Sequence, residues 1–295
     1  MAFTGLNDRG GNSSIAMFAD GPPQQEPIRV CLRLRPMNKF ELSRRSTNCV
    51  TVSKIVSYAA ILEKGLDMYG NGGDAIKIDS PLEGEFNYVF DKVFPEESTQ
   101  LAVYQHVVAP LASHALEGFN CALIAYGQTG SGKTHTMMGG YENAGTKHHK
   151  SSKKTTRANC YDEKSGMIHR LTRDVFLLIH QSPPTVEYIV RCSFVEIYLE
   201  KVLDLLNPIN RTIQILFSEP HTANGGSYNE GVRLHGASEA CCFDEYDVIS
   251  LLVRGNACRS VSSTQMNTDS SRSHAIFIMK IEQKDNQYCN YWKIC

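Results

Sequence analysis

The sequence has very little net charge and no long apolar run. Its 295 residues include 30 Lys and Arg against 31 Asp and Glu, which leaves a formal charge of −1. A chain without an overall field has no general attraction for nucleic acid or for a membrane surface, so a polyanionic partner would have to meet a local basic patch. No apolar segment approaches the roughly 20 residues that a membrane-spanning helix needs. We therefore expect no nucleic-acid partner and no membrane insertion.

The first 27 residues lack the basic start and the apolar centre of a secretory signal peptide. They are polar, and they predict a disordered N-terminal extension (1–27) in front of one folded domain (28–295). The composition, with 42% hydrophobic and 21% charged residues, is that of an ordinary globular protein.

The ten cysteines are not arranged for metal binding or redox chemistry. None belongs to a C-x-x-C pair, and no His is placed to complete a zinc set. Several lie in apolar, strand-like runs, where a thiol behaves as a small hydrophobic group. Reduced cysteines in a cytoplasmic protein are the simplest interpretation.

The run GQTGSGKT (127–134) has the spacing G-x-x-x-x-G-K-T, which is typical of a loop that holds nucleotide phosphates. Such a loop turns backbone N–H groups toward one point and opens a helix whose N-terminus favours anions. Lys133 would reach the β- and γ-phosphates, and the Thr134 hydroxyl would ligate Mg²⁺. The apolar run CALIAY (121–126) predicts the strand that this motif requires in front of it. A chance match in a Gly-rich loop is the alternative, and the preceding strand argues against it.

The rest of the chain predicts strands that alternate with helices. We expect strands over 28–36, 121–126, 185–198 and 274–283. We expect helices over 101–117, from 133 onward, and over 167–180, 199–206 and 242–259. Pro110 predicts a kink or break in the first of these helices. Short strands and loops are expected in 37–85, a turn-like segment in 86–94, and irregular structure in 207–240. The alternation indicates an α/β fold with a mainly parallel central sheet flanked by helices.

The stretch 139–166 interrupts this pattern. It is rich in Gly, Ser and Thr and carries five basic residues, namely Lys147, Lys150, Lys153, Lys154 and Arg157. Its composition predicts a mobile loop. Two interpretations remain open: a solvated insert without a role, and a basic segment that is weakly attracted to an acidic partner.

The polar run NTDSSRSH (267–274) lies between a predicted helix and the last predicted strand. Read alone, it fits a Ser-rich loop. Beside the phosphate loop, it resembles the switch I motif of kinesin motor domains, N-x-x-S-S-R-S-H. Other stretches resemble the same family in the same order: RLRP (33–36), FDKVF (90–94) followed by VY (103–104), YGQTGSGKTHTMMG (126–139) and VEIYLEKVLDLL (195–206). The resemblance covers roughly residues 28–283.

The resemblance implies a phosphate-loop NTPase of kinesin type, with ATP or ADP and Mg²⁺ as cofactors. It implies that the phosphates are held by Gly127, Gln128, Thr129, Gly130, Ser131, Gly132, Lys133 and Thr134. It places Arg33, Arg35 and Pro36 beside the adenine, with His135 near it. From the residues alone, the two arginines fit a solvated strand face equally well, and His135 fits a packing role.

The resemblance also implies the residues that act on the reacting phosphate. Thr134 and Ser271 would ligate Mg²⁺, and Asn267, Ser270 and Arg272 would position the attacking water and stabilise the closed loop. Phosphoryl transfer depends mainly on positioning and on charge neutralisation, so hydroxyl ligands, Lys133 and a metal ion suit it. The catalytic set implied here is therefore Asn267, Ser270, Ser271 and Arg272.

The sequence departs from the family after Arg272. Kinesins carry a second switch, D-x-x-G within DLAGSE, after the strand that follows switch I, and no D-x-x-G occurs in this stretch. The family's two further central strands, most of its track-binding face and its neck linker would also be missing. A truncated or mis-predicted chain is one explanation, and a genuine short chain without a full ATPase cycle is the other. We expect the first.

The expected function is a microtubule-based motor domain that binds and hydrolyses ATP in the cytoplasm, on the microtubule cytoskeleton. Binding to microtubules (tubulin) would be weakened or lost in this chain. One alternative is a nucleotide-binding fragment or non-motile interaction protein without an ATPase cycle. Another is an unrelated phosphate-loop enzyme such as a small-molecule kinase, which leaves NTDSSRSH and VEIYLEKVLDLL unexplained. The sequence has no coiled-coil heptads and predicts no oligomeric state.

Overall fold

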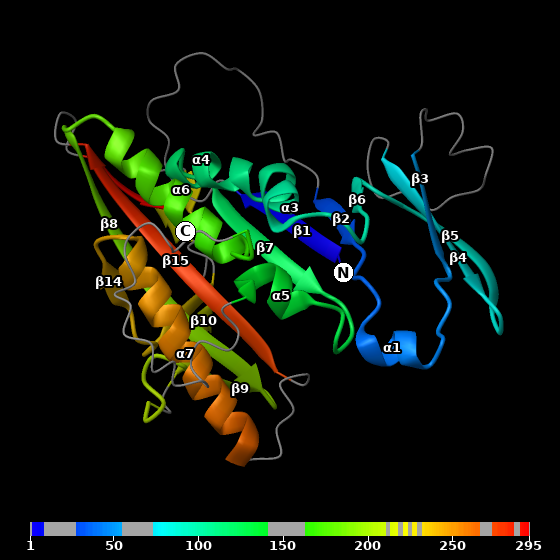
Figure 1. The fold of residues 1–295 in the computed structure, drawn as a ribbon. Helices are drawn as coiled ribbons and strands as arrows, with labels where there is room; N and C mark the ends of the chain where they lie inside the picture. Colours follow the sequence, from blue (N-terminus) through cyan, green and yellow to red (C-terminus); the bar gives the residue numbers. More distant parts are fainter. Residues whose placement is uncertain are drawn as a thin grey trace.

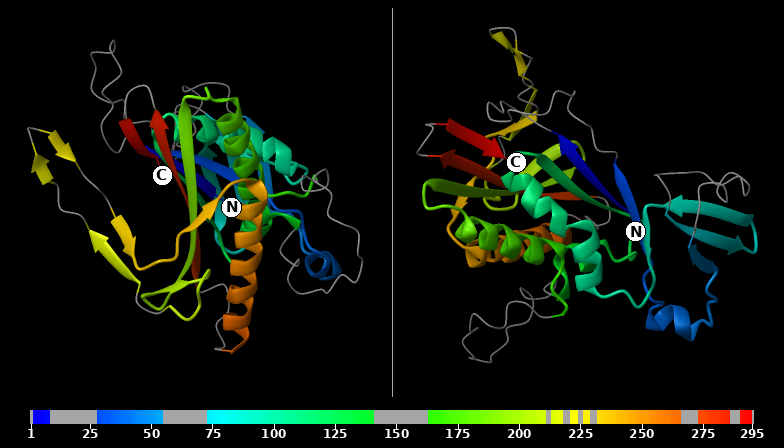
Figure 2. Two further views of the ribbon diagram at one scale, coloured as in Figure 1. Left: turned by 90° about the vertical axis from the view of Figure 1, so that its left-hand side faces the viewer. Right: turned by 90° about the horizontal axis from the view of Figure 1, so that it is seen from above.

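The computed structural model describes residues 2–8, 28–54, 73–140, 163–210, 213–217, 221–223, 226–228, 232–265, 273–285 and 290–294. Two sheets and the helices packed against them form the main body (Figure 1). A small three-stranded sheet and two short hairpins extend away from that body (Figure 2). Among the helices in these ranges, none is both long and apolar enough to cross a membrane.

The first sheet has four strands in the order β6-β2-β1-β7. They are β1 (Ala2–Asp8), β2 (Arg29–Arg33), β6 (Lys92–Phe94) and β7 (Asn120–Tyr126). β1 is antiparallel to both of its neighbours, so β2 and β7 point in the same direction. The α/β class is confirmed, but parallel pairing among the described strands is confined to β2 and β6.

Ala2–Asp8 forms a strand, which differs from the disorder predicted for this part of 1–27. This segment pairs with β2 through four residue pairs and with β7 along its whole length. It thereby supplies backbone partners to two strand edges that would otherwise be unpaired inside the sheet. Those partners lie far along the chain, so the composition of the segment alone did not indicate a strand. Residues 9–27 lie outside the described part of the chain.

The second sheet has the order β14-β8-β15-β16. It is built on β8 (Val186–Tyr198) and β15 (His274–Asp285), which are antiparallel along the whole of β15. Its other strands are β9 (Lys201–Asp204), β14 (Ala240–Cys242) and β16 (Asn290–Ile294). The strands predicted at 185–198 and 274–283 are therefore confirmed.

Strand β9 corrects the helix predicted at 199–206. Leu199 and Glu200 have φ angles of 47° and 60°, and they form a two-residue turn after which β9 pairs back onto β8. Positive φ at both turn positions gives the twist that suits a tight hairpin. The apolar residues that follow fit a helical or an extended period over so short a run, and the turn decides between the two.

The strands outside the main body are short. β3 (Val50–Lys54), β4 (Asp74–Ser80) and β5 (Gly84–Phe90) form the three-stranded antiparallel sheet. β10 (Gln214–Phe217) pairs with β13 (Val232–His235), and β11 (His221–Ala223) pairs with β12 (Gly226–Tyr228). The turn-like prediction for 86–94 and the irregular prediction for 207–240 were wrong at these strands. The strands within 207–240 have only three or four residues, which is too few to show a clear alternation. Strand β5 has seven residues, and its pairing with β4 fixes it as a strand.

Within the described ranges, five helices cover the two sheets, and α1 (Lys39–Ser43) lies apart from them (Figure 1). The five are α3 (Gln100–Val107), α4 (Ala109–Leu116), α5 (Lys133–Met138), α6 (Met167–Gln181) and α7 (Glu245–Gln265). The predicted break is confirmed, because Val108 separates α3 from α4 and Pro110 lies in the first turn of α4. Pro is tolerated there because first-turn N–H groups have no helical partner.

Helices α5 and α6 meet at two glycines although residues 139–166 lie between them in the chain. A Cβ on Gly139 would lie 2.1 Å from the Lys164 carbonyl oxygen, and one on Gly166 would lie 2.4 Å from the backbone of Met138. The Gly140 N–H donates to the Lys164 carbonyl at 3.0 Å, and Gly139 bridges Ser165. The two ends of the insert are therefore held together. Residues 141–162, with the five basic residues, lie outside the described ranges.

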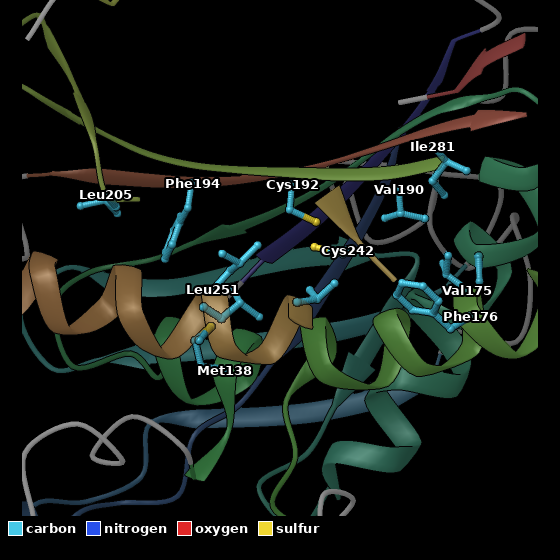
Figure 3. Packing of buried hydrophobic residues seen from close by; sticks show 13 residues of the cluster. Met138, Val175, Phe176, Val190, Cys192, Phe194, Leu205, Cys242, Leu251 and Ile281 are labelled. Atoms are coloured by element: carbon cyan, nitrogen blue, oxygen red, sulfur yellow. The ribbon is translucent and has the colours of Figure 1, made fainter. Parts of the chain in front are cut away.

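The apolar core has two clusters that share partly buried residues. One packs α6 and α7 against the second sheet and includes Phe176, Phe194 and Leu251 (Figure 3). The other packs α3 and α4 against the first sheet around Val103 and Val108. Leu171 and Met137 pack against both clusters, so α6 and α5 connect the two sheets.

The buried cysteines belong to this core. Cys192 and Cys242 face one another between β8 and β14 (Figure 3). The hydrogen bond between these two thiols, together with burial, raises the pKa of Cys192. Burial also raises the pKa of Cys31 to about 11. Thiols that stay protonated at neutral pH are weak nucleophiles, so Cys192 and Cys31 act as small apolar groups. The same hydrogen bond lowers the pKa of Cys242, which is the acceptor of the pair.

Gly255 lies inside α7 and is buried against β8. A Cβ at this position would lie 2.2 Å from Cδ1 of Phe194. We expect Gly255→Ala to lower the free energy of unfolding by about 1–3 kcal/mol through overpacking. Helix propensity alone would give the opposite sign, a gain of about 1 kcal/mol. Denaturant unfolding distinguishes the two, with Ser250→Ala on the exposed side of α7 as the control; a stabilised Gly255→Ala variant would refute the packing argument.

Candidate nucleotide site

The phosphate-loop sequence lies between the end of β7 and the start of α5, as its motif requires. Gly130 and Gly132 have φ angles of 78° and 93°, a region that other residues rarely adopt. A Cβ added at either glycine would meet no atom within 4 Å. The glycines are therefore needed for the backbone conformation, and the space beside the loop is open to a ligand.

Lys133 begins α5 and folds back over the loop. Its Nζ donates hydrogen bonds to the carbonyl oxygens of Gly127 at 2.7 Å and Gln128 at 2.9 Å. An ammonium held by two neutral carbonyls can exchange them for phosphate oxygens, which make stronger, charge-assisted hydrogen bonds. This conformation places the Lys133 ammonium over the loop, where the phosphates of a nucleotide would bind.

Two hydroxyl groups complete this side of the site. The Ser131 Oγ is buried and has no hydrogen-bond partner within the described residues. A buried hydroxyl without a partner is uncommon in folded proteins, and a bound oxyanion beside it would satisfy it. Thr134 is exposed in the first turn of α5, where its hydroxyl is free to ligate a hard cation. These residues fit a nucleotide phosphate with Mg²⁺.

The residues predicted to flank the adenine are engaged in protein contacts. Arg33 donates from Nη1 to Gln100 Oε1 at 2.7 Å and to Thr136 Oγ1 at 3.0 Å, and from Nη2 to the Ser98 carbonyl at 3.1 Å. Burial lowers the pKa of Arg33. The side chain of Arg33 therefore points toward α3 and toward α5, the helix that contains His135.

Arg35, Pro36 and His135 lie nearer the surface. Arg35 donates to both carboxylate oxygens of Glu41, at 2.8 and 2.6 Å, and to the Pro36 carbonyl at 2.8 Å. This ion pair fixes Arg35 against α1, where Asn38 caps the helix with Glu41 as its capping-box partner. The side chains of Pro36 and His135 are exposed, so they remain available to a base.

The second predicted constellation falls on residues that the structure does not describe. Asn267, Ser270, Ser271 and Arg272 lie in the segment between α7 and β15, outside the described ranges. No group of three or more potential metal-ligating His, Cys, Asp or Glu side chains occurs among the described residues. The described part of a metal site is thus the Thr134 hydroxyl.

The end of that segment is fixed by a buried ion pair. Glu196 of β8 is buried, and its Oε1 accepts from Arg259 Nε of α7 at 2.9 Å. The Ser273 hydroxyl also donates to Glu196 Oε1, and Arg259 Nη2 donates to the Ser273 oxygen Oγ at 3.1 Å. Ser273 directly precedes β15, so the residue next to Arg272 is held against both β8 and α7.

Sequence reasoning missed Gln100, Arg259 and Glu196 as parts of this site. Glu196 lies in the stretch VEIY, whose pattern indicates a family resemblance but no role for the carboxylate. Gln100 and Arg259 contact partners more than 30 residues away, so no local spacing indicated them. The polar character of Gln100 and Glu196 at buried positions is the signal that identifies them once the fold is known.

These features define a nucleotide-binding domain of the phosphate-loop class. The family model described as Kinesin motor domain matches residues 33–292. The chain therefore belongs to the kinesin motor domain family.

Individual relatives agree with this assignment. A kinesin heavy chain of Botryotinia fuckeliana is 34% identical over 258 residues, which cover 88% of this chain and 24% of that protein. Kinesin-like protein Klp68D of Drosophila melanogaster is 33% identical, with 89% of this chain and 28% of that protein covered. This chain spans about a quarter of the length of these two relatives.

A solved structure of a fast kinesin also matches, with a TM-score of 0.67 and 29% sequence identity. The match covers 89% of this chain and 62% of that one. That structure of a fast kinesin was described for what it implies about that protein's ATPase mechanism and its interactions with microtubules. The fold is thus that of a kinesin-type phosphate-loop α/β domain.

The contribution of the Arg259–Glu196 ion pair to stability can be tested by mutation. The side chains are 19% and 8% exposed, so Arg259→Met leaves a buried carboxylate without its cation. We expect a loss of about 3 kcal/mol in the free energy of unfolding, and Glu196→Gln added to that variant should restore part of it. Denaturant unfolding measures both, with Arg254→Met on the exposed side of α7 as the control. Equal stability of the Arg259 and Arg254 variants would contradict the assignment.

Proposed function

We propose that this chain is a motor domain that binds and hydrolyses ATP and couples hydrolysis to movement along microtubules. The observation that carries the proposal is the phosphate loop. Its glycines have the required φ angles, Lys133 is folded over it, and α5 begins directly behind it. Membership of the kinesin motor domain family supports the coupling to microtubules.

The residues divide into four roles in this proposal. Residues 127–134 bind the phosphates of ATP or ADP through backbone N–H groups and the Lys133 ammonium. Thr134 and Ser271 would hold Mg²⁺, which supplies charge neutralisation on the phosphate oxygens when bound. Asn267, Ser270 and Arg272 would position water and stabilise the closed loop. Arg35, Pro36 and His135 form the side that faces the base, and for Arg33 we propose a different role below.

The proposed site of action is the microtubule cytoskeleton in the cytoplasm. A second candidate function is nucleotide binding without a complete ATPase cycle, because the geometry of the phosphate loop concerns binding and not turnover. The two candidates share the phosphate loop and differ in turnover.

Removing the Lys133 ammonium tests the binding step. We expect Lys133→Ala to raise the Kd for MgADP by about 10- to 100-fold, because a hydrogen bond to a charged group contributes about 1.5–3 kcal/mol. A titration with a fluorescent ADP analogue measures this, and Lys201→Ala, an exposed lysine on β9, is the control. Unchanged affinity in Lys133→Ala would contradict the assignment of the loop.

Turnover distinguishes the two candidate functions. ATP hydrolysis by the wild-type chain that rises on addition of microtubules supports the motor domain. Binding of MgADP without hydrolysis, with or without microtubules, supports the second candidate. Hydrolysis that does not respond to microtubules would point instead to an enzyme that does not act on this track.

A further inference from the structure

The side chain of Gln100 is buried at the first position of α3 and uses both ends of its amide. Its Nε2 donates to the His135 carbonyl oxygen at 2.7 Å, and its Oε1 accepts from Arg33 Nη1 at 2.7 Å. Gln100 is only 4% exposed. A buried amide with both ends satisfied at short distances fixes the relative position of the groups that it joins.

Arg33 extends this connection to the helix behind the phosphate loop. It donates to the hydroxyl of Thr136, which is 1% exposed, and to the carbonyl of Ser98 in front of α3. The end of β2, the start of α3 and the middle of α5 are therefore joined by a single group of hydrogen bonds. Both terminal nitrogens of Arg33 are engaged within the protein.

The position of α5 depends on such contacts from outside. The helix has only six residues, and so short a helix is marginal without tertiary support. Its first two residues, Lys133 and Thr134, are those that would meet the phosphates and Mg²⁺. His135 and Thr136, the residues held by Gln100 and Arg33, follow immediately, so a shift of α5 there moves the binding groups as well.

We propose that Gln100 and Arg33 are positioning residues of the phosphate site, which fix α5 and thereby Lys133 and Thr134. Arg33 acts through Thr136 and Gln100 and not by contact with the base. This inference rests on the proposed function, because it concerns the affinity of the same site. It differs from the role that the family resemblance implies for Arg33, which is a contact with adenine.

Pyrophosphate and ADP together separate the two roles, because pyrophosphate has no base. We expect Gln100→Met and Arg33→Met each to weaken binding of Mg-pyrophosphate and of MgADP by about the same factor, roughly tenfold, the equivalent of about one hydrogen bond. The double variant should lose little more than either single variant, because both residues act through one connection. Isothermal titration measures the affinities.

Matched controls lie on the same elements. Gln105→Met on α3 and Arg29→Met on β2 replace exposed side chains and should leave both affinities unchanged. Gln100→Glu is a second, nearly isosteric variant. It still accepts from Arg33 but sets a carboxylate oxygen against the His135 carbonyl, so we expect the same loss for both ligands. Denaturant unfolding shows which variants fold.

The outcomes are distinct. Loss of MgADP affinity in Arg33→Met with unchanged pyrophosphate affinity would assign Arg33 to the base and overturn the proposal. Unchanged affinities for both ligands in folded Gln100 variants would overturn it as well, while the proposed function would stand. A wild-type chain that binds neither ligand would overturn the proposed function and this inference with it.

Discussion

The site depends on how α5 is held, because a helix of six residues does not hold itself. Three sets of contacts fix it: the strand β7 that enters the phosphate loop, the hydrogen bonds from Gln100 and Arg33 at its side, and the glycine contact with the start of α6 at its end. The bridge between Gly139 and Ser165 makes the last of these independent of the intervening segment. A longer insert costs only about 0.6 kcal/mol of closure entropy for each doubling of its length. The chain can therefore carry a long basic insert directly behind its phosphate loop without moving the loop.

The two sheets of the body are joined by helices and not by strands. Within the described strands, no backbone pairing connects the sheet that contains β7 with the sheet that contains β8 and β15. The connection is mainly apolar, through Met137 of α5 and Leu171 of α6, which pack against both core clusters. The Tyr104 hydroxyl of α3 adds hydrogen bonds to Asp174 and to the Arg170 carbonyl of α6. Apolar contacts are numerous but not directional, so they hold two sheets together without fixing their relative orientation as strictly as a shared ladder would. Hydrogen bonds fix each sheet internally, and helix packing, with the Tyr104 hydrogen bonds to α6, holds one sheet against the other.

The sequence predicted the features that depend on neighbouring residues. The phosphate loop, the break at Pro110 and the long strand β8 follow from local spacing, from the geometry of proline and from apolar alternation. It failed where the deciding partner lies far along the chain. Strand β1 exists through its pairing with β2 and β7, and Gln100 is part of the site through Arg33 and His135.

The region around 199–206 failed for a different reason. Its apolar pattern fits a helix or a strand, and two residues with positive φ that are not glycine decide for a hairpin. Leu and Glu rarely adopt a positive φ, so neither residue predicts this turn from the sequence. The resemblance identified the family correctly because several kinesin motifs occur in the same order along the chain. For single residues such as Arg33, it implied roles but not contacts, and the contacts came from the structure.

The two segments of the candidate nucleotide site are attached to different sheets. The phosphate loop follows a strand of the first sheet, whereas the segment with Asn267 to Arg272 ends at Ser273, which the ion pair of Glu196 and Arg259 fixes to the second sheet. A ligand that contacts both loops would therefore connect the two sheets by further directional bonds, in addition to the apolar contacts and the Tyr104 hydrogen bonds already present. Its presence or loss would change the relative orientation of the sheets more readily than the structure of either one.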